Sequence, residues 1–524
     1  MRPLFLISLA LAFSRQATAI DVSILEFVNP KKLPSLYTEA IQSAINKAGS
    51  ANGGRVIIPN GTYVSATLTM RSNVTLYLEA GATLRASQKS EDYPSDQFLM
   101  DAGHKLPFLI YAKKCTNIGL EGRGVIDGQA RQESRPMEEV DTYIARETEL
   151  AKQAGIEMKR YYTIDPKVRL IYIEQCDRVS VKDLTIQNSP NWTLHVQECT
   201  DVNISGIALY SNLLSGVNAD GIDVDDCQRV RISNCLIETG DDAICLKSTR
   251  KANQSGCDNI VVTNCNLVST STALKLGTES WGYFKNISFS NCVINNSNRG
   301  IGIFIRDGAR VENVSFDNII INTVRKHFNW WGDGDPIHLV IQKRRDSSII
   351  GSIRGIRLSN ISATSQGTSH ITAIAGATFA DIKLVNVNLT LVPETVPDKR
   401  VSSVIVFRNL TGLTVANGQF AASPGLPPAS KQLITMESVK DASFSDLLLH
   451  STAQHNPLVL KDCENIHISN MRAQTTGIMQ ADGLSAASIY IKSSAFPNAV
   501  SFEAARNLNK KQAVSFSNTN YVYP

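Results

Sequence analysis

The chain has 524 residues, of which 43% are hydrophobic, and a formal net charge of +4 at pH 7. This small charge is not gathered in blocks, which argues against a nucleic-acid partner. No segment after the N-terminus is apolar enough to span a bilayer. Charged residues make up only 19% of the chain, and the many Gly, Ser, Thr, Asn, Val and Ile residues are typical of short strands and turns.

The first nineteen residues have the features of a secretory signal. Arg2 supplies the basic start, residues 3–13 are mostly apolar, and Ala17-Thr18-Ala19 is a cleavage site of the Ala-x-Ala type. We therefore expect a signal peptide over residues 1–19. The mature protein would be secreted, either to the periplasm or to the medium.

A helix is predicted before the first strand. Apolar residues recur at helical spacing over residues 36–48, and glycines at 49, 53 and 54 end the pattern. Short strand patterns follow at residues 55–59 and 73–78. Because a stack of strands exposes its edges at each end, a helix placed here would cap the first coil and prevent edge-to-edge pairing.

From residue 115 onward, a short phrase of the form Asn-Ile/Val-x-Phe/Ile recurs, for example at residues 177–181, 258–262 and 312–316. Such short, regular strands without intervening helices predict a solenoid. A turn asparagine also recurs, at Asn234, Asn264, Asn291 and Asn318; stacked Asn side chains hydrogen-bond along a stack and tolerate left-handed φ. We predict an all-β parallel β-helix. The alternative is a propeller, which would need four-stranded blades at longer periods.

Three further features concern the domain organisation. Most of the ten cysteines fall at matching phases of the repeat, which favours buried stacks, and none has the spacing of a metal site. Residues 130–165 interrupt the repeats and are predicted to form a helical surface excursion that could wall a substrate cleft. Residues 20–524 are expected to form one catalytic domain, in which residues 395–524 are weaker C-terminal coils and a cap.

Two acidic stretches, residues 218–223 and 240–243, lie about one repeat apart. One repeat along the chain is one rung in space, about 4.8 Å, so Asp220, Asp241 and Asp242 are expected to converge. Clustered carboxyl groups push their pKa values apart, which supplies both a proton donor and an ionised base. We predict that Asp241 is the general acid for a glycosidic oxygen. Asp220 and Asp242 would hold and deprotonate a water molecule.

Strand alternation places other side chains on the same face. Lys275, Phe304 and Arg306 are expected to point outward from consecutive rungs. Trp192 and His195, on the rung before the first acidic stretch, are predicted to border the same groove. Aromatic rings stack on sugar faces and cations bind acidic sugars, so these residues are candidate substrate contacts.

These motifs together resemble glycoside hydrolase family 28, the polygalacturonase-like pectinases, over roughly residues 36–340. The matching phrases are Gly-Gly-Arg-Val-Ile-Ile-Pro-Asn-Gly-Thr-Tyr at residues 53–63, Asn-Ser-Pro at 188–190, Asn-x-Asp-Gly at 218–221 and Gly-Asp-Asp at 240–242. The resemblance implies a right-handed parallel β-helix and an inverting hydrolase that needs no metal or other cofactor. It also places the three catalytic aspartates at Asp220, Asp241 and Asp242, with the middle one as the acid.

The chain departs from the family pattern at two motifs. Where polygalacturonases have Gly-His-Gly, this chain has Ser-Thr-Ala at residues 271–273, without the histidine. The family's Arg-Ile-Lys, which grips the galacturonate carboxylate, is matched best by Phe304-Ile305-Arg306. Lys275, Glu279 and Arg306 are therefore predicted to form a different subsite, which favours a rhamnogalacturonan-type or otherwise modified pectic chain, attacked at its end.

The sequence thus predicts a monomeric, secreted glycosidase that cleaves an acidic plant-type polysaccharide or oligosaccharide related to galacturonan or rhamnogalacturonan. Carboxyl groups on neighbouring rungs would lie closer than the roughly 6.5–9.5 Å typical of inverting enzymes. Two alternatives stay open. One is a β-helix polysaccharide lyase with Lys275 or Arg306 as the base and calcium on the aspartates, and the other is a non-catalytic glycan-binding β-helix.

Overall fold

The computed structural model describes residues 19–517, apart from residue 32 and residues 102–103, 136–141, 154, 156–157, 159, 252–254, 327–331, 396–399, 483–488, 493, 496–499 and 504–513. The predicted signal lies outside the described residues except for its last position, Ala19. The sequence also predicts a sugar platform or lid at the paired tryptophans Trp330 and Trp331, and these two residues lie outside the described residues. In the described part of the chain, no helix has both the length and the apolarity needed to cross a membrane.

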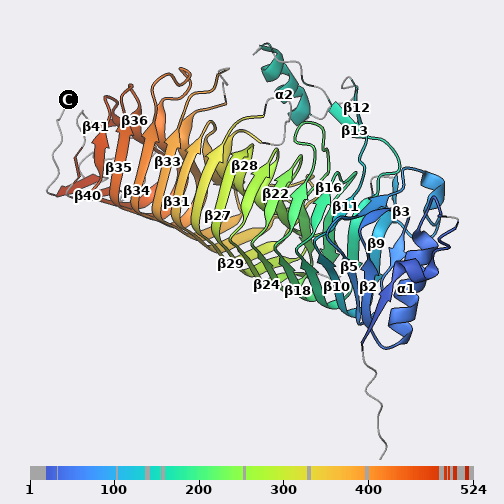
Figure 1. The fold of residues 1–524 in the computed structure, drawn as a ribbon. Coiled ribbons are helices and arrows are strands. Elements are labelled where there is room, and N and C mark those ends of the chain that lie inside the picture. Colours follow the sequence, from blue (N-terminus) through green and yellow to red (C-terminus); the bar gives the residue numbers. More distant parts are fainter. Residues whose placement is uncertain are drawn as a thin grey trace, which may run out of the picture.

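The chain winds into a long stack of coils in which each strand pairs in parallel with the equivalent strands of the neighbouring coils (Figure 1). The strands fall into three columns along the stack. The first column, which carries the site, is β4 (Leu68–Thr69), β9 (Phe108–Lys113), β14 (Arg169–Glu174), β17 (Leu194–Gln197), β20 (Ile222–Asp225), β23 (Ile244–Ser248), β26 (Thr272–Ser280), β28 (Arg299–Ile305), β30 (Asp335–Ile341), β32 (Ser369–Ala373), β34 (Ser403–Ala422), β35 (Gln432–Ser451), β36 (Asn456–Lys461), β39 (Met479–Asp482) and β41 (Val500–Glu503).

The other two columns close each coil. The second column contains β1 (Ile20–Ser23), β2 (Gly54–Ile58), β5 (Val74–Leu78), β10 (Thr116–Gly122), β15 (Asp177–Lys182), β18 (Thr200–Ser205), β21 (Gln228–Ser233), β24 (Gly256–Thr263), β27 (Tyr283–Ser297), β29 (Arg310–Thr323), β31 (Ser352–Ser365), β33 (Thr378–Leu391), β37 (Glu464–Ser469), β40 (Ile489–Lys492) and β42 (Val514–Ser517). The third contains β3 (Gly61–Ser65), β6 (Ala82–Ala86), β11 (Val125–Asp127), β16 (Thr185–Gln187), β19 (Ala208–Tyr210), β22 (Leu236–Thr239), β25 (Asn266–Ser269) and β38 (Arg472–Gln474). From β27 onward, long strands run through two or more columns.

This architecture is a right-handed parallel β-helix, as predicted. The hand agrees with the strong preference of twisted parallel strands for right-handed crossovers. Along each strand, alternate side chains point into one continuous core of Ile, Val, Leu and Phe. Each coil therefore buries its apolar side chains against its neighbours, which is the source of stability in a solenoid.

The predicted capping helix is α1 (Thr38–Ser50), which starts two residues later and ends two residues later than the pattern suggested. It buries Ala40, Ile41, Ala44 and Ile45 against the first coil. Figure 1 places α1 at the end of the stack where the strands of the first coil would otherwise be exposed. The helix thus covers an edge that would invite pairing with another chain.

The recurring turn asparagines form a ladder of hydrogen bonds between coils, which we call the asparagine ladder. Asn234, Asn264, Asn291 and Asn318 have φ values of 57°, 55°, 53° and 52°. The side-chain amide of Asn318 donates to Asn291 Oδ1 over 2.8 Å, and that of Asn264 donates to Asn234 Oδ1 over 3.5 Å. The recurring asparagines therefore satisfy two needs of each turn, a left-handed backbone and a hydrogen bond to the next coil.

We expect Asn291→Ala to lower the thermal midpoint more than Asn291→Gly. Both changes remove the ladder hydrogen bonds, but only alanine bears the cost of a left-handed backbone, about 1–2 kcal/mol, whereas glycine adopts it freely. Thermal unfolding followed by circular dichroism measures the difference. Asn295→Ala on the same strand, at an exposed position outside the ladder, is the matched control and should change little. Equal effects of alanine and glycine at 291 would contradict this account.

All ten cysteines are free thiols. Several stack on consecutive coils: the backbone amide of Cys115 donates to the sulfur of Cys176 over 3.3 Å, that of Cys176 to Cys199 over 3.4 Å, and that of Cys199 to Cys227 over 3.2 Å. Most of the cysteines therefore act as small buried side chains that recur at matching phases of the coil, in line with the prediction.

The interruption predicted at residues 130–165 forms a separate protrusion. It consists of the antiparallel hairpin β12 (Gln132–Arg135) and β13 (Arg160–Thr163) with α2 (Thr142–Gln153) between them. Figure 1 shows these elements rising from the edge of the stack. Beyond residue 395 the repeats weaken in the sequence, yet parallel pairing continues through β34 and β35, which are 20 residues long each, and on to β42. Of the region expected to form weaker coils and a cap, residues 395–524, the part up to residue 482 is described apart from residues 396–399, whereas most of the remainder lies outside the described residues.

Candidate active site

The candidate site lies on the outer face of the first column, where β20, β23, β26, β28 and β30 run side by side. In the register, Ile222 pairs with Ile244, a step of 22 residues. The acidic residues precede these strands directly, so Asp220 and Asp242 occupy equivalent positions on consecutive coils. Consistent with this alignment, the backbone amide of Gly221 donates to the carbonyl of Asp242 over 2.8 Å.

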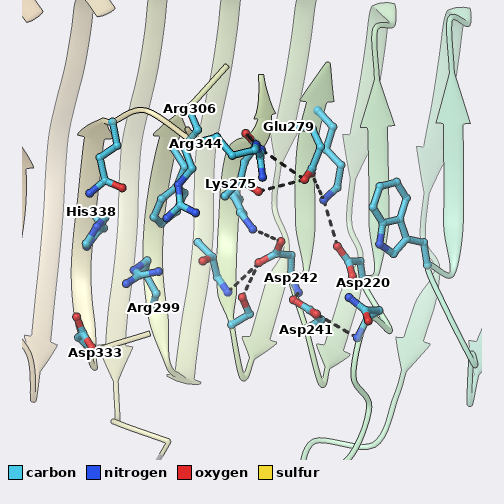
Figure 2. Close-up of a pocket in the computed structure, with 18 of the residues that line it drawn as sticks. Asp220, Asp241, Asp242, Lys275, Glu279, Arg299, Arg306, Asp333, His338 and Arg344 are labelled. Atoms are coloured by element: carbon cyan, nitrogen blue, oxygen red, sulfur yellow. Dashed lines mark hydrogen bonds and ion pairs between the residues drawn. The ribbon is translucent and has the colours of Figure 1, made fainter. Parts of the chain in front are cut away.

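The three predicted aspartates converge. Asp220, Asp241 and Asp242 each present a carboxyl oxygen, and these oxygens all lie within 4.8 Å of one another. All three side chains are almost fully buried from solvent by the protein around them. Figure 2 shows them grouped together, with Lys275 and Glu279 beside them. The repeat brings together residues that no hairpin or helix connects.

Asp241 has the environment of a proton donor. Burial raises its pKa well above the ordinary value, and the neighbouring charges of Asp220 and Asp242 raise it further. The backbone amides of Asn218 and Asp242 donate to its two oxygens over 3.1 and 2.9 Å. The carboxyl group is therefore fixed in orientation, and its raised pKa extends the pH range over which it keeps a proton, as a general acid requires.

Asp242 is held by an ion pair. Lys275 Nζ lies 2.5 Å from Asp242 Oδ2. The other carboxylate oxygen accepts from the hydroxyl of Ser271 over 2.8 Å and from the backbone amide of Thr272 over 3.2 Å. Three donors thus converge on one carboxylate and fix its orientation.

The environment of Asp220 differs from those of Asp241 and Asp242. Burial raises its pKa to about 6, the positive charge of Lys247 opposes this shift, and the charge of Asp242 adds to it. Lys247 Nζ lies 3.5 Å from Asp220 Oδ2. Among the described residues, Asp220 Oδ1 is buried and has no hydrogen-bond partner, so its capacity to accept a hydrogen bond is unused.

Lys247 is a buried cation surrounded by carboxyl groups. Besides Asp220, its ammonium group lies 3.7 Å from Asp223 and 3.4 Å from Glu279. Burial opposes its charge, but the nearby negative groups dominate and raise its pKa well above the ordinary value. Burial would also raise the pKa of Glu279, but Lys247, Lys275 and Arg344 outweigh it and lower that pKa to about 2. Charge balance at this site is thus maintained by lysines within the cluster.

A pocket of about 890 Å³ opens over these groups, within the range of roughly 300–1,000 Å³ usual for small-ligand sites. The predicted residues Asp220, Asp241, Asp242, Lys275, Glu279, Phe304, Arg306 and Trp192 all line it. Most of its positive groups lie on one side of the aspartates, at β26 and beyond: Lys275, Arg299, Arg306, Lys343 and Arg344. This side of the pocket is suited to an anionic ligand.

His195 does not line the pocket. It is only 2% exposed and lies beneath Trp192, with the ring centroids 5.0 Å apart. The alternation rule placed it correctly on the outer face, but Trp192 covers it. Its Nδ1 lies 2.8 Å from Arg169 and its Nε2 lies 3.3 Å from Asp225, and burial lowers its pKa to about 4. His195 is therefore a neutral support for the pocket wall.

Phe304 is also less available than the alternation suggested. It is 5% exposed, and its ring stacks on His338 with the centroids 5.1 Å apart. Arg299 lies 5.0 Å from the same ring and Lys275 lies 5.6 Å from it. Phe304 thus anchors two cations at the pocket. The motif match at residues 304–306 did not predict a further cation on this strand, Arg299, which lies at the beginning of β28.

Several lining residues were not predicted from the sequence, namely Lys247, Arg299, Asp333, His338 and Arg344. Lys247 had a usable signal, because its outward direction follows from strand alternation and it comes five residues after Asp242. His338 Nδ1 and Arg299 Nε both contact Asp335 Oδ2, over 2.6 and 2.9 Å. The contact between Arg299 and Asp335 joins two coils, and no sequence motif predicts it.

The donor set bears on whether a metal ion would bind. Three carboxyl oxygens within 4.8 Å have a spacing that could hold a cation. However, the ammonium groups of Lys275 and Lys247 already pair with Asp242 and Asp220, and they would repel a divalent ion placed between them. The chemistry of the cluster is that of acid–base groups.

The fold and the site together define a parallel β-helix protein with a carboxyl-based acid–base centre. The chain belongs to the glycosyl hydrolases family 28, whose model matches residues 50–401. It is 27% identical over 247 residues to a probable polygalacturonase of Vitis vinifera, covering 44% of this chain and 45% of that protein. It is 26% identical over 259 residues to an endo-polygalacturonase of Pectobacterium carotovorum, covering 48% of this chain and 60% of that one. The chain thus aligns with about half the length of these relatives.

The structure resembles that of a hyperthermoactive exopolygalacturonase from Thermotoga maritima, with a TM-score of 0.56 and 21% sequence identity, covering 80% of this chain and 91% of the other. It also resembles a family 28 exopolygalacturonase from Yersinia enterocolitica, with a TM-score of 0.53 and 18% identity, covering 85% and 78% of the two chains. At these identities the likeness concerns the fold.

Proposed function

We propose that the protein is a secreted glycosidase that hydrolyses O-glycosidic bonds in an acidic, pectin-type glycan related to galacturonan or rhamnogalacturonan. The observation that carries this proposal is the cluster of Asp220, Asp241 and Asp242, in which three neighbouring carboxyl groups have three different environments. Membership of glycosyl hydrolases family 28 supports the reaction class. The polygalacturonase names of the relatives support the substrate class.

The geometry supports a division of labour among the aspartates. Asp241, whose pKa is raised by burial, would donate its proton to the glycosidic oxygen as that bond breaks. Asp220, with its pKa of about 6 and a free oxygen, would accept a proton from water as the water attacks the sugar carbon. Asp242, fixed by Lys275, would hold the water in line. The new bond takes its electrons from the water oxygen, and the old bond leaves its electrons on the departing oxygen.

An acidic substrate follows from the cations beside the aspartates. A sugar carboxylate placed over β26–β30 would face Lys275, Arg299, Arg306 and Arg344. Charge-assisted hydrogen bonds to arginine are among the stronger polar contacts in proteins. The stereochemical course we propose is inversion, as in the family resemblance, although the nearest carboxyl oxygens lie closer than the roughly 6.5–9.5 Å usual for inverting enzymes. Proton NMR of the first-formed anomer decides between inversion and retention.

Turnover on polygalacturonan, rhamnogalacturonan and their oligosaccharides tests the proposal, with reducing ends and the absorbance of unsaturated uronate recorded together. New reducing ends without the chromophore are expected. Chromophore formation would identify a lyase and contradict the acid–base roles given above. Binding without any reaction would instead support a glycan-binding β-helix. Recovery of a mature chain beginning at residue 20 from outside the cell checks the proposed secretion.

We expect Arg306→Gln to weaken the use of acidic substrate specifically. A charge-assisted hydrogen bond contributes about 1.5–3 kcal/mol, so KM for an acidic oligosaccharide should rise by roughly tenfold or more, with a small change in kcat. The matched comparison is the methyl-esterified oligosaccharide, on which wild type and variant should perform alike. A similar loss on both substrates would show that Arg306 shapes the pocket and does not read the carboxylate.

A further inference from the structure

We propose that the pocket is closed on the side of β14 and β17, so that the enzyme binds the end of a glycan chain and releases short products from it. This inference rests on the proposed glycosidase function and adds its mode of attack. A glycan lying along the stack crosses a strand about every 4.8 Å. An enzyme that cuts within a chain needs an open outer face on both sides of its aspartates.

The outer face on the N-terminal side of the aspartates is sealed. Three consecutive strands, β14, β17 and β20, have outward side chains that are at most 7% exposed, a stretch of about 14 Å along the stack. These outward residues are Tyr172, Glu174, His195, Gln197, Asp223 and Asp225. They are polar or aromatic side chains of the kind found on an open face, yet solvent does not reach them.

Trp192 forms the wall of the pocket on this side. Arg169 and Lys247 each lie 4.3 Å from its ring centroid. They come from β14 and β23, strands on opposite sides of β17, which Trp192 precedes directly. His195 meets the ring edge-on. A ring held by two cations and a histidine cannot swing aside easily, so the wall is rigid, and its cationic contacts leave it poorly placed to stack on a sugar.

The segment after β23 covers the rest of this face. Thr249 Oγ1 donates to Asp225 over 2.6 Å. Arg250 reaches further back along the stack, to Gln197 over 3.0 Å and to Glu174 over 3.1 Å. These contacts cross β20 and β17 to β14. The chain itself therefore occupies the path that a glycan would need.

The opposite side remains accessible. Beyond the cationic end of the pocket, several outward residues of the first column are partly or fully exposed, as at His370 and Thr372 on β32, Arg408 on β34 and Lys461 on β36, although Val406 on β34 is buried. A glycan can leave the pocket in this direction. The asymmetry between the two sides points to a site that holds a chain end against Trp192 and lets the remaining chain extend toward the C-terminal coils.

The test is the product profile on oligogalacturonides and rhamnogalacturonan oligosaccharides of defined length, labelled at the reducing end and followed by chromatography from the first turnovers. One short product, with the other fragment shortened stepwise, is expected, and the position of the label shows which end is bound. On the polymer, reducing ends should appear with little early fall in viscosity. A spread of intermediate lengths from the start would overturn the inference while leaving the glycosidase function intact. Hydrolysis of none of these substrates would overturn the proposed function itself.

Two variants locate the wall. Arg250→Ala removes the contacts that cover β14 and β17 without altering an aspartate, and it should add longer products to the profile. Trp192→Ala should do so more strongly, with a folding check by circular dichroism because Trp192 also contacts Lys247. Arg229→Ala, on β21 of the second column and 51% exposed, is the matched control and should leave the profile of wild type unchanged. An unchanged profile in both wall variants would contradict the role given to these residues.

Discussion

Replacing Asp241 by Asn is expected to lower kcat by roughly a hundredfold to ten-thousandfold, the usual contribution of a general acid. The amide has nearly the same shape as the protonated carboxyl group but has no proton to give to the departing oxygen. Substrate binding should persist, because the cations that face the glycan are unchanged. Reducing-end assays give kcat, and calorimetric titration with an oligosaccharide gives the affinity.

The stability of the same variant should fall less than that of the wild type as the pH rises from about 4 toward neutrality. The pKa of Asp241 is raised by burial, so its contribution to stability is present below the pKa of the unfolded chain, about 4, and is lost as the pH rises toward the folded value. An asparagine has no such loss. Asp201→Asn, on the exposed face of another column, is the control and should leave turnover unchanged. Full activity in Asp241→Asn would remove Asp241 from the role of acid.

Replacing Lys247 by Met is expected to destabilise the protein by about 3–5 kcal/mol at neutral pH, the usual result of removing one partner from a buried ionic cluster. Its ammonium group faces Asp220, Asp223 and Glu279. Among the described residues, neither oxygen of Asp223 has a hydrogen-bond partner, so Lys247 is the positive charge that compensates it. Thermal unfolding of the variant and of Lys440→Met, an exposed ion pair expected to contribute at most about 1 kcal/mol, measures the effect.

The pH dependence of the Lys247→Met variant gives a second readout. Without Lys247, the pKa values of Asp220 and Asp223 rise further, and both groups favour the neutral form. The deficit in thermal midpoint should therefore shrink as the pH falls toward about 6, the pKa of Asp220 in the wild type, because these groups take up protons in the variant before they do so in the wild type. In the wild type, activity should increase with pH as Asp220, with its pKa of about 6, becomes ionised; in the variant this limb should move to higher pH. An unmoved limb would exclude Asp220 as the base.

The sequence was sufficient to predict the fold and the centre of the site because both depend on periodicity. The repeat phrase predicts coils, and a separation of about one repeat predicts that Asp220 and Asp242 face each other. The other residues that line the pocket were harder to predict from the sequence. Arg299 and His338 reach the pocket through Asp335, a contact between coils whose lengths vary, and a motif search on one strand does not detect it.

Alternation predicted the direction of side chains but not what covers them. His195 and Phe304 point outward as expected, yet both are buried, one by Trp192 and the other by cations and His338. Whether an outward residue is exposed to solvent depends on the turns that cross the outer face, such as the turn that contains Thr249 and Arg250. The side-chain contacts of Thr249 and Arg250 determine the path of this turn over the face. Such paths leave no periodic signal in a single sequence.

The pocket draws its lining from Trp192 to Arg344, whereas parallel pairing continues to residue 517. Because each coil pairs only with its neighbours, the chemistry depends little on the coils beyond Arg400, whose guanidinium group lies 2.6 Å from the pocket residue Asp333. The chemistry and the length of the molecule are therefore separable properties. This end of the chain is free to gain, lose or exchange whole coils over evolutionary time, and to acquire surfaces for attachment or for long glycans, while the aspartates and their lysines stay as they are.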